Sequence, residues 1–171
     1  LIGSHIIAKG LRACTLVLAA CAGLALAQAD AARSAYERVD YATAVSLDAP
    51  RAAAGDAEAQ YRMGMMARFG WGMDKDTAAA VRWLSAAARQ NHAQAQAELG
   101  AMYRLGRGVP EDAREAARLL TAAALAGVGI AQLSVGRMYR DGIGVDRDLV
   151  EAYAWFSAAG DNNVMDGLAY R

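Results

Sequence analysis

The sequence predicts an all-α protein, an α/α superhelical solenoid of tandem 36-residue helix-turn-helix repeats. Three observations predict it. Only 2 prolines interrupt a chain of 171 residues that is 56% hydrophobic. Alanine, which loses the least side-chain freedom in a helix, dominates the start and the middle of the chain. The sequence also repeats itself in steps of 36 residues, without insertion or deletion.

The 36-residue step is carried by a few residue types that recur at fixed positions. The set comprises Gln60, Gln96 and Gln132; Gly64, Gly100 and Gly136; Arg68, Arg104 and Arg140; the loop pairs Gly70/Gly72, Gly106/Gly108 and Gly142/Gly144; and Asp76, Asp112 and Asp148. Such agreement is implausible by chance and is typical of a solenoid, in which each unit packs on its neighbours. We therefore expect complete repeats at residues 55–90, 91–126 and 127–162.

Residues 1–29 are expected to form a signal peptide. Lys9 and Arg12 supply the positive charge, residues 13–26 are apolar, and Ala27-Gln28-Ala29 fits the small-x-small rule for signal peptidase. This interpretation predicts a periplasmic or secreted protein.

Both cysteines, Cys14 and Cys21, lie in this leader. Cleavage after Ala29 would leave neither cysteine nor disulfide, which is compatible with an oxidising compartment such as the periplasm. The alternative is an envelope lipoprotein, because Leu18-Ala19-Ala20-Cys21 resembles a bacterial lipobox. Only acylation of Cys21 would then anchor the protein to a membrane.

Residues 30–54 are expected to be a divergent N-terminal helix pair that caps the solenoid. Counting 36 residues back from Asp76 gives Asp40, so residues 41–55 occupy the register of a second helix, with residues 31–39 as its leading partner. The pair lacks the glycine loop and carries Pro50, and terminal repeats are commonly atypical because one face meets solvent. At the other end, residues 163–171 begin a further, incomplete repeat.

Each complete repeat is expected to contain two helices, which in the first unit run from about Ala57 to Phe69 and from Thr77 to Arg89. The first loop glycine ends the first helix in a left-handed conformation, and the second lets the chain reverse. The recurring aspartates serve as N-caps of the second helix, and Glu115 and Glu151 follow as partners in a capping box. The glycine inside the first helix marks a place where two helices approach too closely for a β-carbon.

These residues resemble the Sel-one-like repeat (SLR) family, a relative of the tetratricopeptide repeat. The stretch from Ala95 to Val109, AQAELGAMYRLGRGV, is similar to the family's first helix and loop, and EAARLLTAAA from Glu115 to Ala124 to its second helix. The resemblance implies a right-handed superhelix whose concave side binds partner proteins or peptides. Cysteine-rich members of the family staple each repeat with a disulfide, and this chain has no such cysteine pairs.

The candidate partner-binding residues are Trp71, which lies between two loop glycines, and the recurring Arg68, Arg104 and Arg140. An exposed tryptophan is a common interface anchor. The arginines could recognise carboxylates or phosphates along one edge of the solenoid, or they could only complement the dipole at a helix C-terminus.

Composition and motifs give little support to other functions. Without Lys9 and Arg12, 16 basic and 18 acidic groups remain, a balance of about −2, which argues against nucleic-acid binding. His92 is the one histidine after the leader, so zinc clusters and histidine-based triads lack their parts. We therefore predict no catalytic residue, metal or cofactor, and an unidentified protein or peptide partner. An enzyme acting on an envelope substrate is the least supported alternative.

Overall fold

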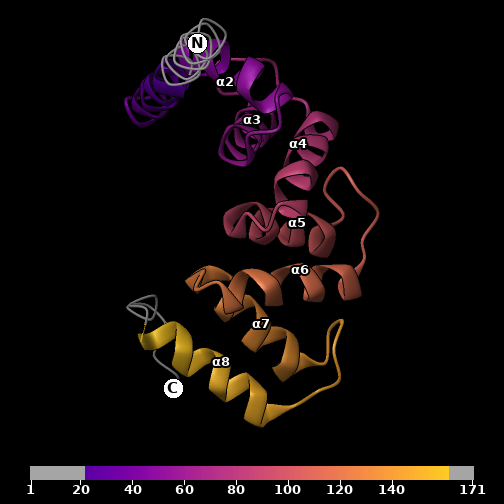
Figure 1. Cartoon of the computed structure of the whole chain (residues 1–171). Coiled ribbons are helices and arrows are strands. Elements are labelled where there is room, and N and C mark those ends of the chain that lie inside the picture. Colours follow the sequence, from indigo (N-terminus) through magenta and orange to yellow (C-terminus); the bar gives the residue numbers. More distant parts are fainter. Residues whose placement is uncertain (1–21, 162–171) are drawn as a thin grey trace, which may run out of the picture.

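The computed structural model describes residues 22–161, which form one curved stack of helices (Figure 1). Residues 22–37 belong to a first helix, and seven helices of 13 residues follow: α2 Tyr41–Ala53, α3 Ala57–Phe69, α4 Thr77–Arg89, α5 Ala93–Leu105, α6 Ala113–Leu125, α7 Gly129–Asp141 and α8 Leu149–Asp161. No strand occurs in the described residues. The predicted all-α solenoid is confirmed.

The helices of the first unit, α3 and α4, begin and end at the predicted residues. The helix of residues 22–37 runs through Ala29, and its later part is the leading partner expected for α2. Cys21, most of the predicted signal peptide and residues 163–171 lie outside the described residues. Within residues 22–161, no helix is long and apolar enough to cross a membrane.

The predicted N-caps and C-caps of the helices are confirmed. The carboxylates of Asp40, Asp76 and Asp112 accept hydrogen bonds from the backbone N–H of Thr43, Ala79 and Glu115, and Asp148 accepts from Val150 and Glu151. The first helices of the three units end at Gly70, Gly106 and Gly142, whose φ values of 76°, 61° and 71° are left-handed. Local sequence therefore determines where each of these helices stops.

The predicted capping box is wrong. Its donor, the Asp112 N–H, already donates to the Tyr103 carbonyl at 3.0 Å across the loop. The Glu115 carboxylate instead accepts two hydrogen bonds from Arg118, and these hold the pKa of Glu115 below its ordinary value. The Asp148 N–H likewise donates to the Tyr139 carbonyl, at 2.9 Å.

Two sets of glycines are positions of close packing. A β-carbon on Gly64, Gly100 or Gly136 would lie 2.7, 2.8 or 2.6 Å from a side-chain carbon of Leu84, Leu120 or Phe156, as the sequence predicted. The second loop glycines Gly72, Gly108 and Gly144 have left-handed φ and lie against Tyr41, Thr77 and Ala113, where a β-carbon would come within 2.5, 2.6 and 2.0 Å. Each of those residues starts the second helix of the preceding unit. The second glycine thus controls how closely consecutive units stack.

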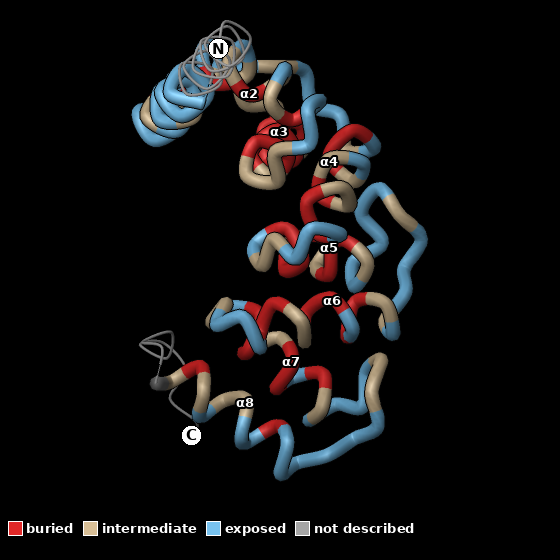
Figure 2. The backbone as a smooth tube through the Cα atoms, in the orientation of Figure 1, coloured by how far each residue is buried: buried red, intermediate tan, exposed pale blue. Residues whose placement is uncertain are grey.

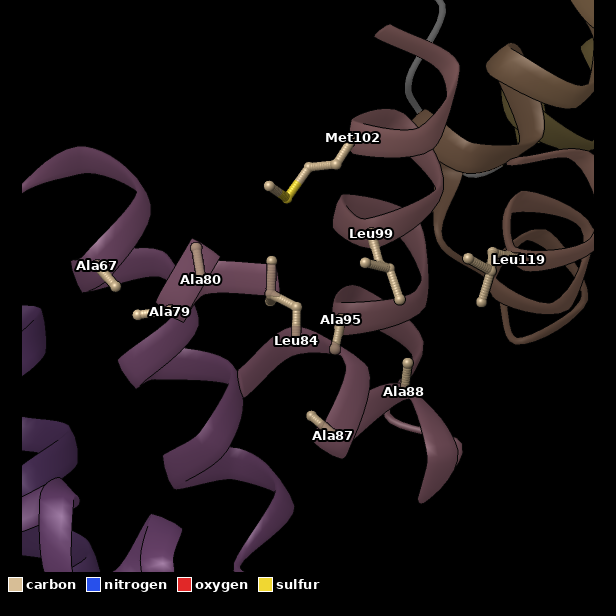
Figure 3. Packing of buried hydrophobic residues seen from close by; sticks show 10 residues of the cluster. All are labelled: Ala67, Ala79, Ala80, Leu84, Ala87, Ala88, Ala95, Leu99, Met102 and Leu119. Atoms are coloured by element: carbon tan, nitrogen blue, oxygen red, sulfur yellow. The ribbon is translucent and has the colours of Figure 1, made fainter. Parts of the chain in front are cut away.

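Buried residues line the contacts between helices, whereas the loops are largely exposed (Figure 2). In the close-up of the central cluster, Ala87 and Ala88 of α4 lie near Ala95 and Leu99 of α5 (Figure 3). Small side chains allow this close helix packing. The methionines predicted to fill gaps, Met63, Met65, Met66, Met102 and Met138, are all buried.

The recurring glutamines join consecutive units, a role the sequence did not suggest. The Nε2 atoms of Gln60, Gln96 and Gln132 donate to the carbonyls of Ala52, Ala88 and Ala124 at 3.1, 3.2 and 3.1 Å. Each bond is buried and reaches back to the last turn of the preceding helix. A polar side chain is thus accommodated inside each junction because its hydrogen bond is made.

The junction between α2 and α3 also holds a buried ion pair. Asp48, which is fully buried, accepts from Arg62 Nε at 2.7 Å and from Nη2 at 2.8 Å, and Arg51 adds a third bond at 3.0 Å. Burial acts to lower the pKa of Arg62, but its bonds to Asp48 keep that pKa above its ordinary value.

Candidate functional site

The predicted binding residues lie at the ends of the first helices and in the glycine loops. We call residues 68–76, 104–112 and 140–148 the loop edge. In Figure 1 the loops after α5 and α7 project from the outer side of the arc, away from its open side. Because each first helix ends at the same register, the loop edge presents the same positions once per repeat.

Arg68 is held in place at the loop edge. Its Nη1 atom donates to Glu98 of the next repeat, and its guanidinium lies 4.9 Å from the centre of the Phe69 ring. The side chain contributes to a cavity of about 500 Å³ between the first and second repeats, together with Lys75 and Arg107. This arginine therefore links two units as well as facing a cavity.

Arg104 occupies the same register one repeat later but is more exposed. Ser134 stands where the preceding unit has Glu98, and Arg104 has no ion pair with any described residue. It lines a cavity of about 230 Å³ with Ser134, Glu111 and Arg137. The guanidinium of Arg104 is therefore available to a ligand.

Arg140 differs again. Its Nε and Nη2 atoms donate to the Asp141 carboxylate at 2.8 and 3.0 Å, which lowers the pKa of Asp141. It lines an apolar cavity of about 480 Å³ with Leu149, Tyr153 and Phe156 of α8. The three arginines share a register and each faces a cavity, but their surroundings differ.

Trp71 is not the free loop side chain that its position between two glycines indicated. Its half-buried ring stacks on Tyr41 at a centroid distance of 4.9 Å and on Phe69 at 4.7 Å, and it meets the edge of Tyr36. Burial raises the pKa of Tyr36 to about 12. Trp71 thus packs the cap against the first repeat, and Phe69, 46% exposed, is the more accessible ring.

His92 is the N-cap of α5. Its Nδ1 accepts the Ala95 N–H at 3.2 Å, so the ring proton sits on Nε2, which donates to Glu58 at 3.0 Å. The ring also stacks on Tyr61 at 4.8 Å. Both ring nitrogens are therefore engaged in structure. No group of three or more potential metal ligands was found within residues 22–161.

Solved structures with this fold were found. A Sel1 repeat protein from Oxalobacter formigenes superposes with a TM-score of 0.73 at 27% identity, over 77% of this chain and 54% of its own. The protein c5321, a protective antigen present in uropathogenic Escherichia coli strains displaying an SLR fold, gives 0.74 at 34% identity, over 80% of this chain and 30% of its own. The chain thus spans about half the length of the first and under a third of the second.

The cysteine rich protein B of Helicobacter pylori shares the fold at 22% identity, with a TM-score of 0.53 over 69% of this chain and 90% of its own. No curated protein matches the sequence. The family model of the Sel1 repeat matches residues 57–92, 93–128 and 129–164, which is more than half of the chain. The chain therefore belongs to the Sel1 repeat family, whose proteins are generally non-catalytic scaffolds that bind other proteins.

Proposed function

We propose that this protein is an interaction scaffold of the bacterial cell envelope that binds a partner protein or peptide along its loop edge. The observation that carries the proposal is the row of cavities described above. Arg68, Arg104 and Arg140, which share one register of consecutive repeats, each line a different cavity. A surface that presents a guanidinium once per repeat is suited to an extended partner, which can contact several units at once.

The envelope location rests on the predicted signal peptide. The alternative is a lipoprotein anchored through Cys21. Mass spectrometry of the mature protein distinguishes them, because cleavage after Ala29 gives a chain that starts at Asp30, whereas the lipoprotein starts at an acylated Cys21. A chain that keeps all of residues 1–29 in the cell would contradict both.

Partner capture tests the loop edge. Tagged wild-type protein and the Arg104→Glu variant are incubated with envelope extract, and bound proteins are identified by mass spectrometry. The substitution should abolish capture because it reverses the charge offered to the partner. It should leave Tm nearly unchanged because the exposed Arg104 has no ion pair to lose among the described residues.

Arg89→Glu is the matched control. Arg89 is also an exposed arginine in the last turn of a helix, but it lies at the end of α4, outside the loop edge. Capture should survive in this variant. Equal loss in both variants, or a large fall in Tm for Arg104→Glu, would contradict a binding role for the loop edge.

A further inference from the structure

We propose that the cavity between the first and second repeats binds an acidic segment of the partner, with carboxylates at Lys75 and Arg107 and an apolar side chain at Phe69. The proposal rests on the scaffold function proposed above and names the chemistry of its ligand. The cavity, of about 500 Å³, lies within the size range of ligand sites in proteins.

The cavity carries an excess of positive charge. Arg68, Lys75 and Arg107 line it, and none of the described lining residues is acidic. Glu98, outside the lining, neutralises Arg68. Lys75 and Arg107 are exposed and form no ion pair or side-chain hydrogen bond within residues 22–161. Two cations that share a cavity without counter-charges favour an anionic ligand.

The cavity also offers an apolar contact and a pre-positioned guanidinium. Phe69 lines it and is 46% exposed, and the partly exposed Thr77 lines it as well, whereas Met102 of the lining is fully buried. Arg68 is fixed by Glu98, with its guanidinium near the Phe69 ring. A peptide with acidic residues beside an apolar one matches this combination of charge and exposed ring.

The other junctions lack this arrangement, although the fold repeats it. One repeat later, the positions equivalent to Arg68, Lys75 and Arg107 hold Arg104, Glu111 and Ile143. One unit earlier, the same positions hold Ala32, Val39 and Trp71. The later cavity is smaller, about 230 Å³, and includes the carboxylates Glu111 and Asp141. At these positions, the junction between the first and second repeats thus combines three cations. The junction between the second and third repeats does not, and it serves as the comparison site.

The experiment uses two peptides, GEELEEG and GQQLQQG, each with fluorescein on its N-terminal amine and an amidated C-terminus. They differ only in the exchange of the Glu side chains for Gln, which removes the negative charge. Fluorescence anisotropy measures their binding to wild-type protein at low salt. We expect the acidic peptide to bind at least about tenfold more tightly, and added salt to reduce that preference, because the contacts are between charges.

The double variant Lys75→Glu with Arg107→Ile gives the cavity the residues of its neighbour and should remove the preference. Arg89→Glu with Arg114→Ile is the control, since it removes the same charge from exposed arginines outside the cavity and should keep the preference. Circular dichroism melting verifies that both variants fold.

Equal binding of the two peptides, or equal loss in the control variant, overturns the proposal. A wild-type protein that captures its partner through Arg104 and shows no preference for the acidic peptide also overturns it, while the scaffold function stands. A protein that captures no partner overturns the scaffold function instead, whatever the peptides show.

Discussion

The cap and the first repeat meet through a buried ion pair and stacked aromatic rings, whereas the buried core between the first and second repeats is apolar and their polar contacts, Arg68 with Glu98 and His92 with Glu58, are partly exposed. Between α2 and α3, Asp48 and Arg62 form a buried ion pair, and Trp71 stacks on Tyr41 nearby. Between α4 and α5 the contact consists mainly of alanine, leucine and methionine. The difference is sharpest at one position, because the register of Asp48 holds Leu84 in the first repeat. Both residues are fully buried.

A buried leucine and a buried aspartate restrict their neighbours differently. Leucine packs against apolar surface of suitable shape, which any repeat can supply. A buried carboxylate is stable only if a cation and hydrogen bonds meet it, and here Arg62 donates twice at 2.7 and 2.8 Å. The register of Arg62 holds Glu98 and Ser134 in the later repeats, so Asp48 fits only the first of them. We infer that the ion pair makes the cap specific for one end of the stack.

The largest expected effect comes from breaking this ion pair. Asp48→Ala removes the carboxylate and leaves Arg62, 3% exposed, with Glu58 as its one acidic partner within residues 22–161. We expect a loss of about 3–5 kcal/mol in the free energy of unfolding, because an uncompensated buried charge is costly. Urea denaturation measures it.

The double variant Asp48→Leu with Arg62→Met tests whether the pair contributes specificity more than stability. It introduces the leucine that the repeats carry at this position and leaves no buried charge, so stability should return to within about 1 kcal/mol of wild type or exceed it. A double variant as unstable as Asp48→Ala would show that the cap needs the ion pair itself.

The next effect concerns the stacking glycines of the inner repeats. Gly144→Ala places a β-carbon 2.0 Å from the Ala113 carbonyl oxygen at a φ of +75°, so strain and overpacking together should cost about 3 kcal/mol. Gly127 is the matched control: its φ is +86° with no atom within 4 Å of the added β-carbon, so Gly127→Ala should cost only about 1 kcal/mol. Similar losses in the two variants, measured by thermal melting, would mean that the close contact between units is unimportant.

Sequence repetition predicted the features that depend on local backbone. The bounds of α3 and α4, the aspartate N-caps and the left-handed C-cap at Gly70 follow from residue types that each constrain a few neighbouring dihedral angles. The close approach at Gly64 was also predictable, because a glycine that recurs inside a helix needs a reason.

Features that depend on one particular tertiary neighbour were not predictable. Trp71 is half-buried because Tyr41 provides a ring to stack on, and Thr77 and Ala113 occupy that register in the later units. The ion pair of Asp48 and Arg62 joins two helices through residues that ordinarily lie on surfaces. The charge of the cavities that contain Arg68 and Arg104 combines residues of two units, so no single repeat reveals it.

A smaller effect is expected from the glutamine bond, which the cap junction and the repeat junctions share. Gln96→Leu removes the donor to the Ala88 carbonyl and should cost about 1 kcal/mol, the usual net value of one hydrogen bond. Gln60→Leu should cost more, because Gln60 donates to Ala52 and also accepts from Gln90 at 2.8 Å. A lower urea midpoint for Gln96→Leu than for Gln60→Leu would contradict this order, because it would give the single bond of Gln96 more weight than the two bonds of Gln60.

The smallest effect is a pH dependence at Glu58 of α3, whose carboxylate pairs with His92, the N-cap of α5 in the second repeat. A hydrogen bond from His92 and the nearby Arg62 hold the pKa of Glu58 below its ordinary 4.5, although partial burial opposes them. A lowered carboxyl pKa stabilises the folded state above the unfolded value, and that contribution disappears as the pH falls through the folded value. Wild type should therefore exceed Glu58→Gln in urea midpoint at pH 7, and the difference should shrink as the pH falls below about 4.5. A difference independent of pH would assign the effect to packing and not to the charge of Glu58.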